Sequence, residues 1–216
     1  MRRLLLSLPL LAIAALPGRP ADDAGGFKPL FNGTDFTGWQ TAGGQPVTKG
    51  WVVKDGAMVR VSAGGDVWTK DRFGDFVLEL EFKTAGNSGV FVRTDNPKDN
   101  VQTGIEIQVD VPRGKPDKHS VGAIYDLVPP TKENARKDDW NKMTVTAKGP
   151  VLAVEVNGEK VAEMNLDRWT EPGKNPDGTK NKFKTALKDF KREGHVGLQD
   201  HGAAVSYRNI RIRPLK

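Results

Sequence analysis

Apolar and polar residues alternate in short runs along most of the chain. In residues 76–83, Phe76, Leu78, Leu80 and Phe82 fall on one face of an extended strand, and the residues between them are mainly charged. A period of two predicts a strand with one buried face. Similar runs, each predicted to be a strand, occupy residues 51–53, 58–61, 89–93, 104–109, 141–147, 151–156, 159–164, 194–198 and 205–213.

Glycine and proline separate these runs, and two hairpin turns can be placed. Asn157-Gly158 joins residues 151–156 to 159–164, and Asp55-Gly56 joins the runs on either side of it. Both dipeptides tolerate the positive φ that tight hairpins require. Many short strands with frequent turn signals predict an all-β sandwich or barrel.

Residues 181–190 show a different pattern. Phe183, Leu187 and Phe190 are spaced at i, i+4 and i+7, which predicts about three turns of helix. The segment follows a loop rich in Pro, Gly and Lys at residues 171–180. We expect the two together, residues 171–190, to form one short helical insertion packed on the sandwich.

The length of 216 residues and the absence of cysteine bound the function. The length favours a single domain. Without cysteine the chain has no disulfide scaffold, thiolate metal site, cysteine nucleophile or lipidated cysteine. No GxxxxGK[ST] or GxGxxG motif indicates a nucleotide site.

The first 21 residues resemble a secretory signal peptide. Arg2 and Arg3 precede a mainly apolar run at residues 4–16, which is shorter than the roughly 20 residues that span a bilayer. We expect cleavage between residues 14 and 24, and export to the periplasm or the medium; the alternative is an uncleaved anchor. Cleavage lowers the formal charge of +6 by three, and the remaining charges are mixed, so we expect no nucleic-acid partner and no membrane insertion of the mature chain.

Residues 104–110 (GIEIQVD) carry the strongest chemical signal. Glu106, Gln108 and Asp110 face one side of the predicted strand, and three apolar residues face the other. Such a row favours a cleft floor that binds sugar hydroxyls or a divalent cation, although a plain solvated strand face is the alternative. Glu106 and Asp110 are about 13 Å apart along a strand, too far for the paired carboxylates of a glycosidase.

A second group must therefore come from elsewhere, and residues 197–202 (GLQDHG) are the best source. Gln199, Asp200 and His201 follow the apolar end of a strand. Histidine suits proton transfer near neutral pH, with an ordinary pKa of about 6.5. The alternative is that Asp200 and His201 only close a hairpin loop.

Three further residues are weaker candidates. Arg93 could hold a carboxylate or a developing oxyanion, or form a surface ion pair; Tyr125 could stack on a sugar or seal the core; Trp140 could be a sugar platform or packing. His119 and His195 are isolated in the sequence. The metal that this composition suggests is a hard cation with oxygen ligands.

Several segments together resemble the 3-keto-disaccharide hydrolase family, also described as 3-keto-glucoside 1,2-lyase/3-keto-2-hydroxy-glucal hydratase. The resemblance covers residues 27–215 as one domain. It rests on the order and spacing of residues 29–39 (PLFNGTDFTGW), 73–82 (FGDFVLELEF), 86–93 (GNSGVFVR), 104–110 (GIEIQVD), 122–125 (GAIY), 194–202 (GHVGLQDHG) and 208–212 (RNIRI).

The resemblance implies a concanavalin/lectin-like jelly roll of two antiparallel sheets and an exported enzyme that cleaves 3-keto-glucosides. The C3 ketone acidifies the C2 proton, a base removes it, the C1 substituent is expelled, and water adds to complete hydrolysis. The catalytic residues implied are His201, Glu106 and Asp200. Substrate contacts fall to Gln108, Arg93, Gln199, Tyr125 and Trp140, and a divalent metal, if one takes part, to Glu106 and Asp110. No organic cofactor is expected.

Three other readings stay open at this point. Jelly rolls also form non-catalytic carbohydrate-binding modules, so fold alone does not establish an enzyme. A retaining glycoside hydrolase of the same architecture would carry a Glu-x-Asp-x-x-Glu strand, and this motif is absent. A structural envelope protein is the third.

Overall fold

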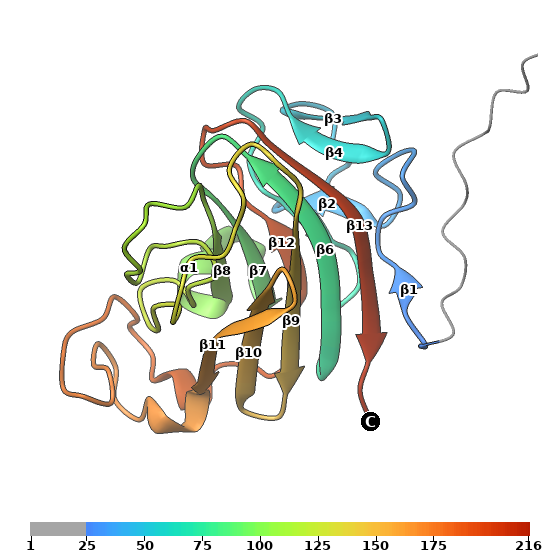
Figure 1. Cartoon of the computed structure of the whole chain (residues 1–216). Helices are drawn as coiled ribbons and strands as arrows, with labels where there is room; N and C mark the ends of the chain where they lie inside the picture. The colour runs from blue at the N-terminus through green and yellow to red at the C-terminus, as the bar shows by residue number, and fades with distance from the viewer. Residues whose placement is uncertain (1–24) are drawn as a thin grey trace, which may run out of the picture.

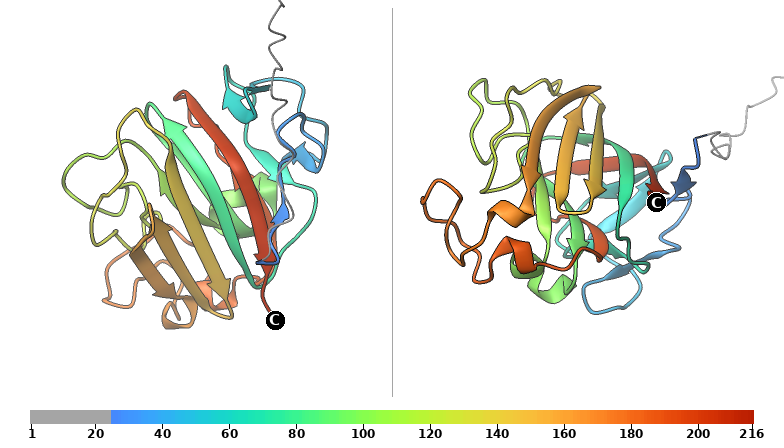
Figure 2. Two further views of the ribbon diagram at one scale, coloured as in Figure 1. Left: turned by 45° about the vertical axis from the view of Figure 1, so that its right-hand side comes forward. Right: turned by 90° about the horizontal axis from the view of Figure 1, so that it is seen from below.

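The computed structural model describes residues 25–216, so the predicted signal segment lies outside the described residues. Two antiparallel sheets pack face to face (Figure 1). The larger has the order β11-β10-β9-β6-β13-β4-β3, with β1 beside β13, and the smaller has the order β2-β5-β12-β7-β8. The two views of Figure 2 show both layers. The jelly-roll sandwich that the sequence predicts is therefore confirmed.

The predicted strands are present, each within one residue of the expected ends. The larger sheet contains β1 (Lys28–Pro29), β3 (Trp51–Lys54), β4 (Ala57–Arg60), β6 (Phe76–Thr84), β9 (Asn141–Lys148), β10 (Val151–Val156), β11 (Glu159–Asn165) and β13 (Val205–Pro214). The smaller contains β2 (Trp39–Thr41), β5 (Val67–Thr69), β7 (Ser88–Thr94), β8 (Ile105–Val109) and β12 (His195–Leu198). Sequence analysis missed β1, β2 and β5, which are too short to show an alternation.

The core lies between the sheets and follows the alternation. Phe76, Leu78, Leu80 and Phe82 of β6 are at most 1% exposed and face the apolar residues of the smaller sheet. Both predicted hairpins are confirmed, because Asn157 and Gly158 have φ of 52° and 82° at the turn between β10 and β11. Asp55-Gly56 turns in the same way between β3 and β4.

The predicted helix at residues 181–190 is wrong. Only a single 3₁₀ turn, η3 (Leu187–Asp189), forms there, although Phe183, Leu187 and Phe190 are buried as the pattern requires. The backbone makes a different set of bonds: Gly173 N–H donates to the Phe183 carbonyl (2.7 Å) and Asn181 N–H to the Gly173 carbonyl (2.9 Å). These bonds pinch the base of a loop, and the phenyl rings reach the core from irregular backbone.

Helical structure occurs elsewhere in residues 25–216, in short pieces. The α-helix α1 (Asn100–Thr103) follows the 3₁₀ turn η1 (Pro97–Asp99) and leads directly into β8; another 3₁₀ turn, η2 (Leu166–Arg168), follows β11. In the described part of the chain, no helix has the length and hydrophobicity needed to cross a membrane.

The outer face of the smaller sheet, turned away from the core, is where the acidic strand β8 presents its polar residues. Strand pairing places five residues in one row across it: Gln40, Trp68, Gly197, Phe91 and Glu106. The Trp68 and Phe91 rings are at most 1% exposed and pack at 5.2 Å between centroids. Glu106 lies at the end of this row, beside α1.

Candidate functional site

Glu106 is the centre of the site, and the neighbouring strand makes room for it. Ile105, Ile107 and Val109 enter the core, so Glu106 faces outward, as the alternation predicts. Gly89 of β7 lies beneath its side chain. A Cβ atom at Gly89 would be 2.5 Å from Glu106 Oε1 and 2.9 Å from its Cγ. Only glycine leaves the carboxylate this position.

The surroundings of Glu106 prepare it for proton transfer near neutral pH. Burial raises its pKa to about 7, and the negative charge of Asp66 acts in the same direction. The Lys182 ammonium and the Gln199 side chain oppose the rise. Such a carboxyl group is both a stronger base than an ordinary glutamate and partly ionised at pH 7.

Gln199 is brought beside Glu106 as the sequence predicts. Its N–H donates to the Gly89 carbonyl (2.9 Å), and its own carbonyl accepts from Ser88 Oγ (2.7 Å). The Gln199 Oε1 atom is buried and makes no hydrogen bond in the described structure. It is an acceptor that a sugar hydroxyl could satisfy.

His201 and Asp200 follow Gln199 but have different surroundings. His201 is exposed at the rim of the site, and it is close enough to Asp66 to oppose the rise in the pKa of that carboxyl group. Asp200 is tied into the structure: it forms an ion pair with Arg60 and accepts from Gly64 N–H (2.8 Å) and Gly65 N–H (2.9 Å).

These contacts argue against a catalytic role for Asp200. Burial alone would raise its pKa, but the two amides and Arg60 hold it below the ordinary value. A carboxylate that is fully engaged in this way neither takes nor gives a proton near pH 7. We therefore assign Asp200 to positioning the turn that carries His201, in place of the catalytic role predicted from the sequence.

Asp66 and Asn100 belong to the site and were missed by sequence analysis. Asp66 Oδ1 accepts from Asp200 N–H (2.8 Å), and Oδ2 accepts from Asn100 Nδ2 (2.8 Å). Burial raises the pKa of Asp66, with the charge of Asp200 adding to the effect and the two hydrogen bonds opposing it. Asp66 thus joins α1 to the Gln199–His201 turn. Neither Asp66 nor Asn100 forms a recognisable sequence motif with Glu106.

Tyr125 lies in the site, and it brings Lys182 with it. Tyr125 N–H donates to the Glu106 carbonyl (2.9 Å), which fixes the ring beside β8. Lys182 Nζ lies 4.1 Å from the centroid of this ring. Lys182 comes from the insertion at residues 171–190, and no sequence pattern indicated that it would reach the site.

Gln108 and Asp110 occupy the same strand face but do not complete a metal centre. Gln108 is fully buried and donates to Asn87 Oδ1 (3.1 Å), while Asp110 is 4% exposed, pairs with Arg113 and accepts from Val111 N–H (2.7 Å). Within residues 25–216, no three His, Asp or Glu side chains gather as a ligand set. The donor set does not fit the expected divalent metal, because the Asp110 oxygens are already engaged.

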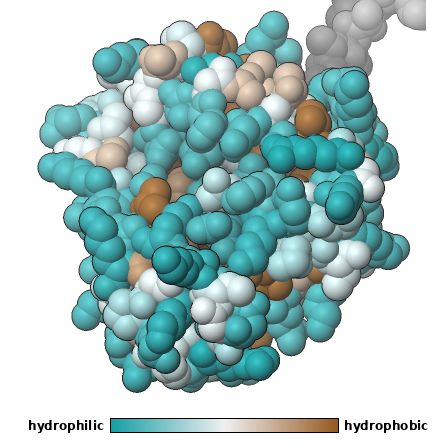
Figure 3. All heavy atoms as spheres, turned by 90° about the vertical axis from the view of Figure 1, so that its left-hand side faces the viewer, coloured by the Kyte–Doolittle hydropathy of each residue, from teal (hydrophilic) through white to brown (hydrophobic). Residues whose placement is uncertain are grey.

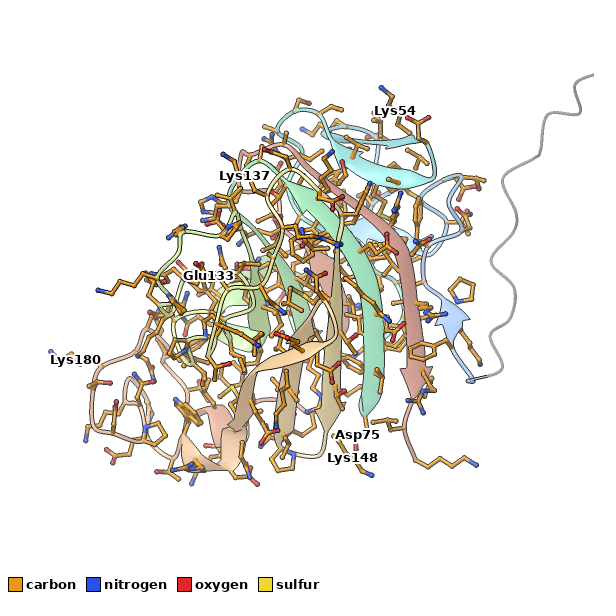
Figure 4. The ribbon with its side chains drawn as sticks, in the orientation of Figure 1. Lys54, Asp75, Glu133, Lys137, Lys148 and Lys180 are labelled. Carbon is orange, nitrogen blue, oxygen red and sulfur yellow. The ribbon has the colours of Figure 1, made fainter. Side chains whose placement is uncertain are left out.

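Arg93 and Trp140 lie away from Glu106, contrary to the sequence prediction. Arg93 is 3% exposed and donates to the Gly74 carbonyl (2.9 Å), the Gly149 carbonyl (2.7 Å) and Asp75 Oδ1 (2.7 Å). Asp75 directly precedes β6 and lies close to Lys148 (Figure 4). Trp140 packs under Arg208, whose guanidinium is 4.0 Å from the ring centroid.

The surface beside the site is polar. Figure 3 looks onto the side formed by the loops between β8 and β9 and by the insertion, and it shows hydrophilic side chains with scattered apolar atoms. A separate groove of about 900 Å³ lies on the larger sheet, lined in part by Asn32, Glu79, Glu81, Lys142 and Arg211. In this groove Glu79 pairs with Lys142 and Arg211, and Glu81 pairs with Arg208, so it is separate from the site around Glu106.

Comparison with known proteins gives a consistent result. Residues 26–213 match the family described as the 3-keto-alpha-glucoside-1,2-lyase-like domain. A 3-keto-disaccharide hydrolase of Bacteroides thetaiotaomicron is 29% identical over 89% of this chain and 80% of its own length. Two crystal structures from Parabacteroides distasonis, both described provisionally as glycosyl hydrolases, are also similar. The first has 32% identity and a TM-score of 0.77 over 88% of this chain and 99% of its own; the second has 28% and 0.72 over 89% and 95%.

Proposed function

Because the chain belongs to the 3-keto-alpha-glucoside-1,2-lyase-like domain family, we propose that it cleaves 3-keto-glucosides. Cleavage proceeds by loss of the C2 proton and of the C1 substituent, and addition of water gives net hydrolysis. The observation that supports this most directly is the part-buried carboxyl group of Glu106, whose pKa is about 7. An elimination of this kind needs one such base and does not need two carboxylates across the glycosidic bond.

In the first step the Glu106 carboxylate takes the C2 proton. The C–H electron pair forms the C2–C3 double bond of an enolate, with the negative charge on the C3 oxygen. Collapse of the enolate restores the C3 ketone, forms the C1–C2 double bond and breaks the bond from C1 to the leaving oxygen. That oxygen needs a proton, and His201 at the exposed rim is the group that we assign to supply it.

In the second step water adds across the C1–C2 double bond. Water gives one proton back to His201 as its hydroxide joins C1, and protonated Glu106 returns its proton to C2, so both groups are regenerated. The sum is one water consumed and one alcohol released. No step is routed through a metal ion. Gln199 and Tyr125 line the same face and contact the sugar, while buried Gln108 supports Asn87 beneath it.

The substrate is thus a small sugar, and nucleic acid has no part in the reaction. We also propose that the protein is exported, on the basis of the signal-like sequence at residues 1–21. The mature enzyme would then meet its substrate in the periplasm or outside the cell.

The test is turnover of a chromogenic 3-keto-glucoside by wild type and by the Glu106→Gln variant. Loss of the base should lower kcat by about 10²–10⁴-fold. Glu155→Gln is the matched control, since Glu155 is a part-buried strand glutamate of β10 on the other sheet, and it should leave kcat unchanged. For wild type, kcat/KM should rise with pH through about 7 as Glu106 ionises, and a chelator should have no effect.

Three results would contradict the proposal. Cleavage of the unoxidised glucoside at an equal rate would show that the ketone is not needed. Full activity of Glu106→Gln would remove the assigned base. Tight binding of the keto sugar without turnover would indicate a carbohydrate-binding module.

A further inference from the structure

The proposed reaction places a negative charge on the C3 oxygen, and the site needs a positive group to stabilise it. Sequence analysis gives Arg93 as one candidate for this role, with a surface ion pair as the alternative. Its guanidinium is instead committed to the Gly74 and Gly149 carbonyls and to Asp75, away from Glu106. The cation must come from another part of the chain.

The insertion at residues 171–190 contains a suitable cation, Lys182. Gln102 of α1 forms hydrogen bonds with the insertion on both sides of residue 183: Gln102 Nε2 donates to the Lys182 carbonyl (3.2 Å), and Lys184 N–H donates to Gln102 Oε1 (2.8 Å). Phe183 between them is 5% exposed and anchored in the core. Because α1 runs into β8, the backbone of Lys182 is held to the element that carries Glu106.

The Lys182 side chain is directed to the same place. Its ammonium lies 4.1 Å from the centroid of the Tyr125 ring, and Tyr125 is bonded to the Glu106 backbone. The carboxylates that attract this ammonium are Glu106 and Asp126. Lys182 is exposed as a residue, but partial burial of its ammonium lowers its pKa, an effect that the charges of Asp126 and Glu106 oppose.

We propose that Lys182 is a catalytic residue, which donates a hydrogen bond to the C3 oxygen of the keto sugar and neutralises the enolate formed when Glu106 takes the C2 proton. This inference rests on the proposed function. The charge on C3 develops only as the proton leaves, so the contribution of Lys182 is larger in the transition state than in the bound substrate.

The test compares Lys182→Gln with Lys180→Gln. Lys180 is an exposed lysine two residues earlier in the insertion, and its side chain projects from the outer edge of the molecule (Figure 4). Lys182→Gln should lower kcat by about 10²–10³-fold with little change in KM. It should slow exchange of the C2 hydrogen with solvent deuterium equally, since both processes pass through the enolate. Lys180→Gln should match wild type.

A second readout does not depend on turnover. Lys182 lowers the pKa of Glu106, so Lys182→Gln should raise the midpoint of the Glu106 carboxyl titration, followed by carbon-13 NMR, and Lys180→Gln should not. If wild type cleaves the keto sugar but Lys182→Gln equals Lys180→Gln in kcat, the assignment of Lys182 is wrong and the proposed function stands. If wild type neither cleaves nor exchanges the keto sugar, both are overturned.

Discussion

Gly89 controls the position of the Glu106 carboxylate, and Gly89→Ala tests whether that position matters. The new Cβ would lie 2.5 Å from Glu106 Oε1, whereas ordinary contact begins at 3.4 Å. The carboxylate must therefore move by about 1 Å, a displacement that can lower the rate of a positioned reaction by about 10²-fold. We expect kcat/KM on a 3-keto-glucoside to fall by that factor.

The fold should survive this substitution. The atoms that Cβ meets are Oε1, Cγ and Cδ of the flexible Glu106 side chain and no backbone atom, and Gly89 has no positive φ. The expected cost is about 1 kcal/mol, at the low end of the range for overpacking, and it is measured as a change in the midpoint of urea unfolding. The control is Gly43→Ala, where the nearest atom is 3.8 Å from the new Cβ.

Two results would refute this reasoning. If Gly89→Ala keeps more than about a third of wild-type kcat/KM, the carboxylate position is not critical for the rate. If it loses activity only in proportion to lost folded protein, Gly89 has a structural role alone. Circular dichroism and kinetics on the same samples separate the two.

Two other predictions concern residues that the structure removes from the chemistry. Asp200→Asn should destabilise the fold by about 1–3 kcal/mol, because Arg60 loses its charged partner. The pKa of Asp200 is lowered in the fold. The difference in Tm between wild type and variant should therefore be full above pH 5 and shrink as the pH falls below about 4. An equal Tm for both proteins at pH 7 would argue against this role. Arg93→Met should cost about 1–3 kcal/mol, because the Gly74 and Gly149 carbonyls and the part-exposed Asp75 lose this hydrogen-bond donor, yet leave kcat per folded molecule unchanged; a selective loss of kcat would return Arg93 to the site.

The alternation in the sequence predicted most of the sandwich, because burial on one face of a strand is a local signal. In Phe76–Phe82 and Ile105–Val109 the alternate apolar residues are the ones that face the core. The helix was wrongly predicted at residues 181–190 for a related reason. The apolar spacing indicates which residues are buried, and an irregular loop can bury them as well as a helix does. Backbone bonds from Gly173 and Asn181, invisible in the pattern, decided the outcome.

The site was only half predictable. Glu106, Gln199 and His201 lie in strands or at strand ends whose direction follows from the alternation. Gly89, Asp66 and Lys182 reach Glu106 from other elements, and only the pairing of strands and the packing of the insertion bring them there. Arg93 misled because residue type and face do not tell which acceptors lie within reach.

The pinched base of the insertion has an implication for how this enzyme could be adapted. The bonds from Gly173 to Asn181 and to Phe183 close the base of the loop on either side of Lys182, and residues 175–179 close a second, smaller turn through bonds of their own. The tip at residues 176–179 is thus closed off from the segment that carries the lysine. We therefore expect changes of length and composition at this tip to leave the position of Lys182 unchanged.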